Sequence, residues 1–170
     1  MADSSDVKQW ILDPTQLNRI ESIHRGFLYQ HLYAVGCLLL SSTSGLSSLF
    51  VETDEDIELI FPDRHLYIQV KTRTLPLQTA DISKTLVHFD QLRKTHLDGK
   101  RPLVPSFYIV SNIKPNHELA EKMKSVDWGN DIFLLWPNCP VGSPVTIPPC
   151  WSDLSEALTW CIEKAGSGSI

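Results

Sequence analysis

The chain has 170 residues, of which 42% are hydrophobic, and this is enough for one domain with a substantial core. Its formal net charge of −5 argues against a protein that coats nucleic acid through bulk positive charge. No apolar run is long enough to span a membrane, and the first residues lack the basic and apolar regions of a signal peptide, so we expect a cytoplasmic protein.

The first predicted element is a long helix from Pro14 to Leu40, preceded by an N-terminal arm over residues 1–14. Two neighbouring apolar stripes follow its helical spacing, so we expect the helix to be substantially buried. The stripes comprise Ile20, Ile23, Phe27, Ala34 and Cys37, and Leu28, Leu32, Val35 and Leu39. Gln30 lies on the first stripe, where a polar side chain needs a partner. It is either a structural hydrogen-bonding residue or part of a site.

Strands and helices follow one another along the rest of the chain. Strands are predicted over Leu46–Val51, Asp56–Phe61, Leu66–Lys71, Val104–Val110 and Asp131–Trp136, and helices over Thr79–His96, Glu118–Lys124 and Ser152–Lys164. The order α-β-β-β-α-β-α-β-α predicts an α/β fold in which helices flank a mixed central sheet. We expect one domain over residues 15–165, followed by a flexible Gly/Ser linker or an expression scar over residues 166–170.

The predicted hairpin within residues 52–73 is the most informative segment for function. Side chains alternate across a strand, so Asp56 and Glu58 share one face of its first strand, and Gln69 and Lys71 share one face of its second. If the strands pair, a carboxylate lies opposite a carboxamide and an ammonium group. This is a hard-cation site beside a positive charge, which suits metal-assisted phosphodiester hydrolysis. The alternative is a solvated hairpin face with ordinary charges.

Basic residues gather directly after this hairpin. Residues 61–130 hold 11 of the 15 lysines and arginines, whereas residues 131–170 hold one. Such side chains can border a site and contact phosphates, and Arg73 and Lys84 are candidates for this role. The alternative for each of them is an ordinary solvated helix surface.

Three short motifs, in this order and on these elements, resemble the restriction-endonuclease-like PD-(D/E)xK nuclease fold. They are Arg25-Gly26-Phe27-Leu28-Tyr29-Gln30 on the first helix, Glu55-Asp56-Ile57-Glu58, and Ile68-Gln69-Val70-Lys71-Thr72. More narrowly, they resemble a bacterial anti-phage branch of double-stranded DNA endonuclease domains. These domains are effectors of cyclic-oligonucleotide defence systems, and similar ones are fused to the N-termini of STAND-type antiviral NTPases. The resemblance covers roughly residues 19–136.

The resemblance assigns roles to four residues of the candidate site. Asp56 matches the metal-binding aspartate of the fold, and Lys71 matches the motif lysine. Gln69 stands where most members have a second carboxylate, and Gln30 stands where many have a helix glutamate. A carboxamide oxygen ligates Mg²⁺ without bringing negative charge, so we expect weaker metal affinity than in those members.

Further side chains are given supporting roles. Glu58, Glu52 or Asp54 would help Asp56 to supply negative charge to the metal. Arg25, on the first helix, would position that helix or contact the DNA backbone, together with the phosphate contacts of Arg73 and Lys84 considered above.

The activity implied by the resemblance is hydrolysis of double-stranded DNA by a Mg²⁺- or Mn²⁺-dependent endonuclease that acts in anti-phage defence. The metal, held by Asp56 and Gln69, would polarise the phosphate and lower the pKa of a bound water, and Lys71 would orient that water or stabilise charge. The resemblance also implies self-association or fusion to a sensor module.

Two other functions stay open at the level of sequence. One is a catalytically degenerate module that binds nucleic acid or protein, because two carboxylates of the fold are replaced by carboxamides. The other is an RNA nuclease, since nothing in the sequence addresses the 2′-hydroxyl. The six histidines lie near no nucleophile motif, and the four cysteines form no C-x-x-C pair, which favours buried reduced thiols over a zinc site.

Overall fold

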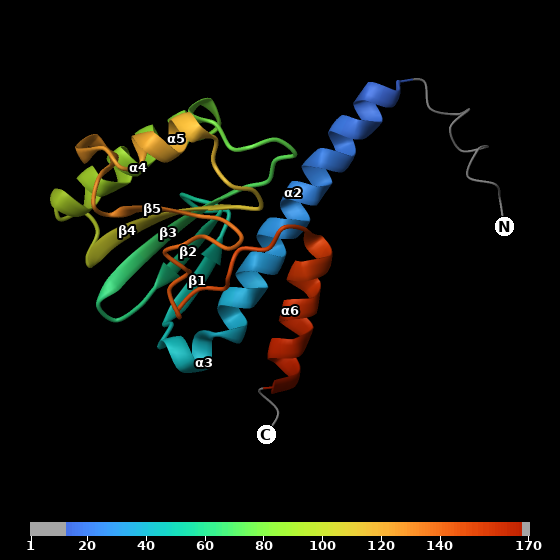
Figure 1. Cartoon of the computed structure of the whole chain (residues 1–170). Coiled ribbons are helices and arrows are strands. Elements are labelled where there is room, and N and C mark those ends of the chain that lie inside the picture. The colour runs from blue at the N-terminus through green and yellow to red at the C-terminus, as the bar shows by residue number, and fades with distance from the viewer. Residues whose placement is uncertain (1–12, 168–170) are drawn as a thin grey trace.

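The computed structural model describes residues 13–167, and its elements follow the predicted order (Figure 1). The elements are α2 (Pro14–Leu39), α3 (Ser41–Ser44), β1 (Ser48–Val51), β2 (Ile57–Ile60), β3 (Arg64–Lys71), α4 (Thr79–Leu97), β4 (Val104–Ser111), α5 (His117–Lys122), η2 (Val126–Trp128), β5 (Ile132–Leu135) and α6 (Leu154–Ser167). The short helices α3 and η2 were not predicted. Residues 1–12 of the predicted arm lie outside the described residues.

The strands form one mixed sheet in the order β1-β2-β3-β4-β5. The first three make an antiparallel meander, whereas β3, β4 and β5 run parallel. Parallel neighbours need a crossover connection, and α4 and α5 supply it. The predicted α/β class with a mixed, helix-flanked sheet is therefore confirmed.

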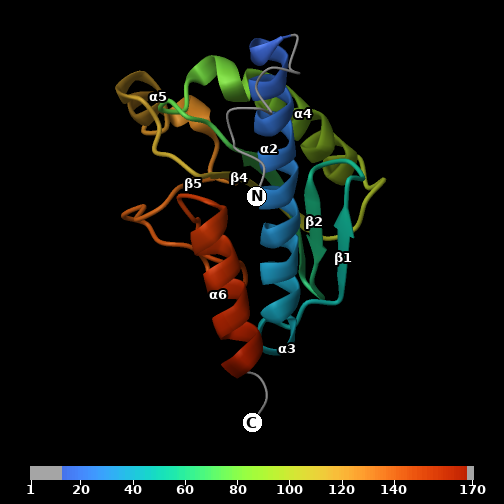
Figure 2. The ribbon, with the colours of Figure 1, turned by 90° about the vertical axis from the view of Figure 1, so that its right-hand side faces the viewer.

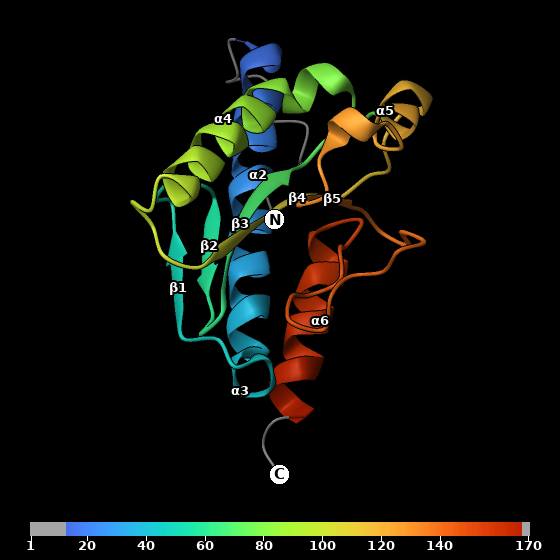
Figure 3. The same cartoon turned by 90° about the vertical axis from the view of Figure 1, so that its left-hand side faces the viewer.

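Helices cover both faces of this sheet. Figure 1 shows α2 and α6 on one face and α4 with α5 on the other, and Figure 3 shows α4 on the near side of the sheet with α2 behind it. Successive residues of β4 point to opposite faces, so Tyr108 and Val110 join the core under α2, while Phe107 and Ile109 join the core under α4. The middle of the sheet is consequently buried on both sides, as is usual for parallel strands.

The C-terminal half of α2 is anchored in the domain. Tyr29 and Tyr33 are fully buried, and their hydroxyls donate hydrogen bonds to the carbonyls of Trp151 and Pro148, each at 2.8 Å. Gly36 allows this contact, because a Cβ atom there would lie 2.6 Å from Cγ of Pro148. Helix α6 packs alongside this half of α2 (Figure 2).

The N-terminal half of α2 corrects the prediction that the whole helix is buried. Ile20, Ile23, Phe27 and Leu28 are 43%, 48%, 45% and 54% exposed. These turns extend past the sheet, and Figure 1 shows no described element lying against the first of them. The apolar spacing is thus continuous along the helix, but the domain covers mainly its second half, and even there Val35 and Leu38 are 42% and 52% exposed.

Three further observations concern the chain as a whole. Helix α6 ends at Ser167, so it takes in the first two residues of the predicted linker, and the remaining residues 168–170 lie outside the described part. The four cysteines are free, and Cys37, Cys150 and Cys161 are buried. Among residues 13–167, no helix is both long enough and apolar enough to cross a membrane.

Candidate functional site

The loop between β1 and β2, residues 52–56, carries three of the predicted carboxylates, those of Glu52, Asp54 and Asp56. The backbone N–H of Glu52 donates to the carbonyl of Asp56 at 3.1 Å, which closes the loop and brings both residues to one end of the sheet. Glu52 has a φ of 59°, in the left-handed region that side chains with a Cβ rarely adopt. This conformation costs roughly 1–2 kcal/mol, so the surrounding contacts must hold it.

Asp56 lies beside Gln69, as the hairpin pattern predicts. The register pairs Ile57 with Ile68, so the residue before Ile57 faces the residue after Ile68. Oδ2 of Asp56 accepts hydrogen bonds from the Gln69 side-chain amide and from the backbone N–H of Val70, the latter at 2.7 Å. Burial raises the pKa of Asp56, whereas these hydrogen bonds and the positive charge of Lys71 oppose that shift.

Gln30 connects α2 to this loop. Its side-chain amide donates to Oε1 of Glu52 at 2.8 Å and lies 3.4 Å from the carbonyl oxygen of Asp56. The residue is only 6% exposed, so these contacts supply the partners that a buried carboxamide requires. Of the two interpretations that the sequence left open for Gln30, the structure shows the hydrogen bonds and places the side chain among the candidate site residues, whereas its part in a functional site stays a prediction.

These side chains meet in an open pocket of about 370 Å³ between α2 and the sheet. Its lining consists of Ile23, Gly26, Phe27, Gln30, Glu52, Asp56, Gln69, Val70 and Thr72. A Cβ atom on Gly26 would lie 3.2 Å from Oγ1 of Thr72, which shows how closely the helix approaches the end of β3. Sequence reasoning placed Gly26 in a motif but did not identify this close approach.

Lys71 is not among the residues that line the pocket. It follows Val70 on β3, so its side chain leaves the strand on the face opposite to that of Val70, which is the face that Gln69 also uses. Burial lowers its pKa, and the negative charge of Asp56 is the largest influence in the opposite direction. Lys71 is therefore partly buried and feels the charge of Asp56, but the pocket brings Asp56 and Gln69 together without it, and its role in the site stays a prediction.

A buried carboxyl group on the α4 side of the loop escaped the sequence-based assignment. Glu55 is 6% exposed, and its Oε1 lies 2.7 Å from Nδ1 of His88 on α4. Burial raises the pKa of Glu55 to about 7, with a further rise from Asp56, while His88 and Lys71 lower it. The contact joins residues 33 positions apart. Nothing in the local spacing of either residue indicates it.

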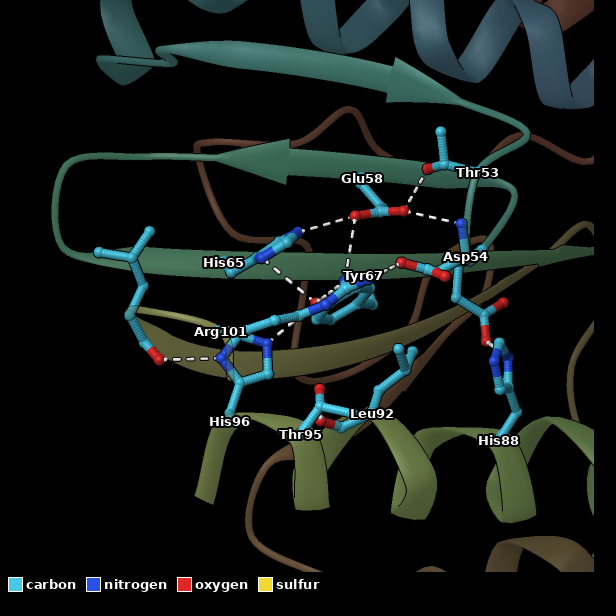
Figure 4. A network of polar contacts seen from close by, with 12 residues as sticks. Thr53, Asp54, Glu58, His65, Tyr67, His88, Leu92, Thr95, His96 and Arg101 are labelled. Carbon is cyan, nitrogen blue, oxygen red and sulfur yellow. Dashed lines mark hydrogen bonds and ion pairs between the residues drawn. The ribbon is translucent and has the colours of Figure 1, made fainter. Parts of the chain in front are cut away.

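Two of the proposed metal helpers face away from the pocket. Glu58 accepts hydrogen bonds from the Thr53 hydroxyl and from the backbone N–H of Asp54 at 2.9 Å, and it lies 3.0 Å from Nε2 of His65. The Asp54 carboxylate is paired with Arg101. Figure 4 shows these groups in one network over α4. The structure therefore gives no support to Glu58 or Asp54 as metal ligands.

Two of the three predicted DNA contacts lie together beside the pocket. Arg25 and Arg73 line a small cleft with Ser22, Thr72, Thr74 and Asn112. Asn112 holds the backbone of Arg73 in two hydrogen bonds, at 2.7 Å and 3.0 Å, and the guanidinium of Arg73 reaches Asp81 at 3.0 Å. Lys84 lies elsewhere, on α4 beside His88.

The donor set determines which metal the pocket suits. Within residues 13–167, no three His, Cys, Asp or Glu side chains gather in a way that could hold a metal ion. The pocket offers carboxylates from Asp56 and Glu52 and carboxamides from Gln30 and Gln69. These oxygens fit Mg²⁺, which is usually bound through one or two carboxylates and keeps several waters. Each carboxamide here directs its N–H to a carboxylate, so a half-turn of the amide exposes its oxygen instead.

A comparison with models of protein families gives one match that covers more than half of the chain. The model described as "Cap4, dsDNA endonuclease domain" matches residues 22–133, which extend from α2 into β5 and include the pocket and the 52–56 loop. Comparisons with curated proteins and with solved structures found no match. The chain therefore belongs to the family of Cap4 double-stranded DNA endonuclease domains.

Proposed function

We propose that this endonuclease domain hydrolyses DNA at the pocket between α2 and the 52–56 loop, with Mg²⁺ or Mn²⁺ as cofactor. The observation that carries the proposal is the Asp56 carboxylate, held by Val70 and Gln69 in a pocket that Glu52 and Gln30 also line. The bound metal would polarise a phosphate oxygen and lower the pKa of a water molecule. Asp56 and Glu52 would hold it, with help from the carboxamide oxygens of Gln69 and Gln30.

The hydrogen bonds to Asp56 orient its carboxylate for this task. Both the side-chain donor and the backbone donor reach Oδ2 of Asp56. Within the described part of the chain no donor reaches Oδ1, so the lone pairs of Oδ1 are available to a ligand. Because Val70 belongs to a buried strand, its N–H is a fixed donor and not a mobile one. The carboxylate is thereby oriented before substrate arrives, which reduces the reorganisation needed during reaction.

Lys71 is the cation nearest to this carboxylate along the strand. Its partial burial strengthens its electrostatic interactions, because fewer water molecules screen them. We assign it the stabilisation of negative charge that develops on the phosphate, or the orientation of the attacking water.

The position of the DNA backbone follows from the neighbouring cleft. Thr72 lines both this cleft and the pocket, so a phosphate in the pocket has Arg25 and Arg73 beside it. Arginine, threonine and asparagine side chains are common partners of phosphate oxygens. Lys84 is further along α4 and would contact a more distant phosphate.

The experiment is plasmid cleavage in Mg²⁺, Mn²⁺ or EDTA by the wild type, Asp56→Ala and Lys71→Ala. We expect each substitution to reduce cleavage by at least about 100-fold, because it removes a charge at the reacting phosphate. Asp63→Ala and Lys122→Ala, at exposed positions outside the site, are matched controls. Activity within two-fold of wild type for both site variants, with unchanged thermal melts, would refute the assignment.

A degenerate DNA-binding module is the second candidate. The observation in its favour is that carboxamides occupy two positions of the pocket where related nucleases carry carboxylates. In that case the wild type would shift DNA in a gel, and it would cleave no faster in Mn²⁺ than in EDTA. Metal-dependent cleavage that Asp56→Ala abolishes would exclude this alternative.

The biological role that we infer is that of an effector in bacterial anti-phage defence. The support is the family match together with the three motifs that resemble that branch. We further infer that the domain acts when it self-associates or is joined to a sensor module. Its lysines and arginines are concentrated in residues 61–130, so a single copy can neutralise few DNA phosphates.

A further inference from the structure

The 52–56 loop is held from the side opposite the pocket. Its end residues, Glu52 and Asp56, line the pocket, whereas its middle residues contact groups on the α4 side. Thr53 and Asp54 bond to Glu58, and Glu55 contacts His88. Figure 4 shows this arrangement from the α4 side. The placement of the pocket carboxylates therefore depends on contacts outside the pocket.

Arg101 contacts three of the residues on this α4 side of the loop. It lies between α4 and β4, and its Nη2 donates to the Asp54 carboxylate. Its Nη1 donates to the Tyr67 hydroxyl at 2.7 Å and lies 3.8 Å from Oε2 of Glu58. One planar guanidinium thus joins the loop, β2 and β3, as its fixed fork of donors allows.

The partners of Arg101 are themselves fixed. Tyr67 is completely buried, and its hydroxyl also lies 2.9 Å from Nε2 of His96 on α4. His96 contacts the carbonyl of Leu103 at 3.1 Å, so the segment that carries Arg101 is bound to α4. Leu103 has a φ of 74°, an unfavourable value for leucine that this contact helps to hold.

Glu58 has its position fixed by the same network. Its carboxylate accepts hydrogen bonds from the Thr53 hydroxyl and the Asp54 backbone N–H, and it lies 3.0 Å from Nε2 of His65. At 4% exposure, a carboxylate with these partners is an acceptor in a fixed position. It therefore gives the loop backbone a rigid point of attachment.

We propose that Arg101 is a positioning residue that holds the 52–56 loop and so places Glu52 and Asp56 in the pocket. This rests on the proposed function, because the importance of the loop comes from the carboxylates that it presents. Arg101 lines neither the pocket nor the small cleft that contains Arg25 and Arg73, so its effect on catalysis passes through the loop. A displacement of about 1 Å at a reacting group can reduce a rate by about 100-fold.

Arg93 provides a matched control on the same side of the sheet. Its guanidinium makes a bidentate pair with Asp131, at 2.7 Å for both bonds, and stacks over Phe107. Its side chain is 26% exposed, against 32% for Arg101. It makes no contact with the loop in the described structure. Arg93→Ala therefore removes a comparable ion pair without releasing residues 52–56.

The experiment compares Arg101→Ala, Arg101→Lys and Arg93→Ala in the full chain by amide hydrogen exchange, Mn²⁺ titration and cleavage kinetics. For Arg101→Ala we expect exchange of the 52–58 peptide to quicken by about ten-fold or more. We expect kcat to fall by about 100-fold with KM within about three-fold. Arg101→Lys should restore only part of kcat, because an ammonium group cannot bridge Asp54 and Tyr67. Arg93→Ala should leave the exchange of this peptide and kcat unchanged.

Each failure has its own signature. Unchanged exchange of the 52–58 peptide in Arg101→Ala overturns the proposal, whatever the activity. Faster exchange with unchanged kcat overturns it too. Arg101 would then hold the loop, but this restraint would not be needed to place the carboxylates for reaction. If the wild type does not cleave DNA, the proposed function fails separately. The positioning of the loop is then decided by exchange and by Mn²⁺ affinity, which Arg101→Ala must weaken.

Discussion

Gln69 illustrates what a carboxamide does beside a carboxylate. Its N–H donates to Asp56, so it stabilises the ionised carboxylate without a metal. A second carboxylate at this position would instead place two negative charges in contact. Such an arrangement needs a cation between the two groups or the protonation of one of them, so the carboxamide makes the metal-free site more stable.

Gln69→Glu is predicted to reverse this balance. In EDTA the melting temperature should fall by a few degrees, equivalent to about 1 kcal/mol of repulsion and lost hydrogen bonding. In Mn²⁺ the variant should recover stability and bind the ion more tightly than wild type by about ten-fold. Calorimetric titration and thermal melts with and without Mn²⁺ are the measurements. Gln91→Glu, at an exposed position on α4, is the control. A variant that binds Mn²⁺ no better than wild type would remove Gln69 from the list of ligands.

Glu52 combines a strained backbone with a polar pocket. Glycine is the residue that tolerates its φ of 59° without steric cost. A glutamate at this position therefore points to a role for its side chain, which contacts Gln30 and lines the pocket.

Two substitutions of Glu52 separate strain from function. Glu52→Ala keeps the strain and loses the hydrogen bond from Gln30, whereas Glu52→Gly loses both. We expect the glycine variant to be more stable than the alanine variant by about 1 kcal/mol, and both to cleave DNA more slowly than wild type. Urea unfolding and plasmid cleavage measure the two effects. An alanine variant at least as stable as the glycine variant would mean that the backbone at Glu52 is unstrained.

At the scale of elements, the two halves of the continuous helix α2 differ in how much the domain covers them. Its second half packs against β3, α6 and the segment that contains Pro148, whereas the first half extends past the sheet. The same apolar spacing runs through both halves, but the energetic consequence of a substitution differs between them.

Gly36→Ala and Ile20→Ser test this division. Glycine to alanine within an exposed helix usually stabilises by about 1 kcal/mol. Here we expect a loss of about 1–3 kcal/mol, because the new methyl group would lie 2.6 Å from the rigid ring of Pro148. Ile20→Ser, in the exposed half, should change stability by less than about 0.5 kcal/mol beyond its helix propensity. Denaturant unfolding of both variants is the measurement, and a stabilised Gly36→Ala would contradict the packing described for this half.

Periodicity predicts the elements well because it reports which face of a segment is apolar. Periodicity could not show that α2 extends beyond the end of the sheet, since this depends on where the neighbouring elements end. It also placed Asp56 and Glu58 on one face, which holds only for residues within the strand. Asp56 precedes β2, so its carboxylate turns to the Val70 N–H, while Glu58 remains on the α4 face. Contacts between distant residues, such as Gln30 with Glu52, leave no local signal.

At the scale of the molecule, the distribution of charge limits how a single copy binds DNA. The formal net charge is −5, and the bases are concentrated in residues 61–130. Several of them are used internally, since Arg93 pairs with Asp131 and Arg101 with Asp54. DNA affinity depends on the number of phosphates that are neutralised, so one copy offers only a short track.

Forced assembly is therefore predicted to increase cleavage. Fusion of the chain to a stable dimer or tetramer should raise plasmid cleavage per active site by about 10–100-fold at low salt, because linked copies raise each other's effective concentration on one duplex. The measurement is cleavage rate per site over a wide range of protein concentrations. A fusion that carries Asp56→Ala in every copy is the control. If the unfused chain cuts equally fast throughout, activation by assembly is wrong, although the nuclease assignment can survive.

The 52–56 loop has a consequence for sequence variation. Surface loops usually accept inserted or deleted residues at small cost, because closure entropy changes slowly with length. Here one backbone hydrogen bond spans the loop from Glu52 to Asp56, and the residues between them are tied to the opposite face. One added residue would rotate the following side chains out of the pocket, whichever amino acid it was. The length of this loop should therefore vary less among related chains than the identity of its residues.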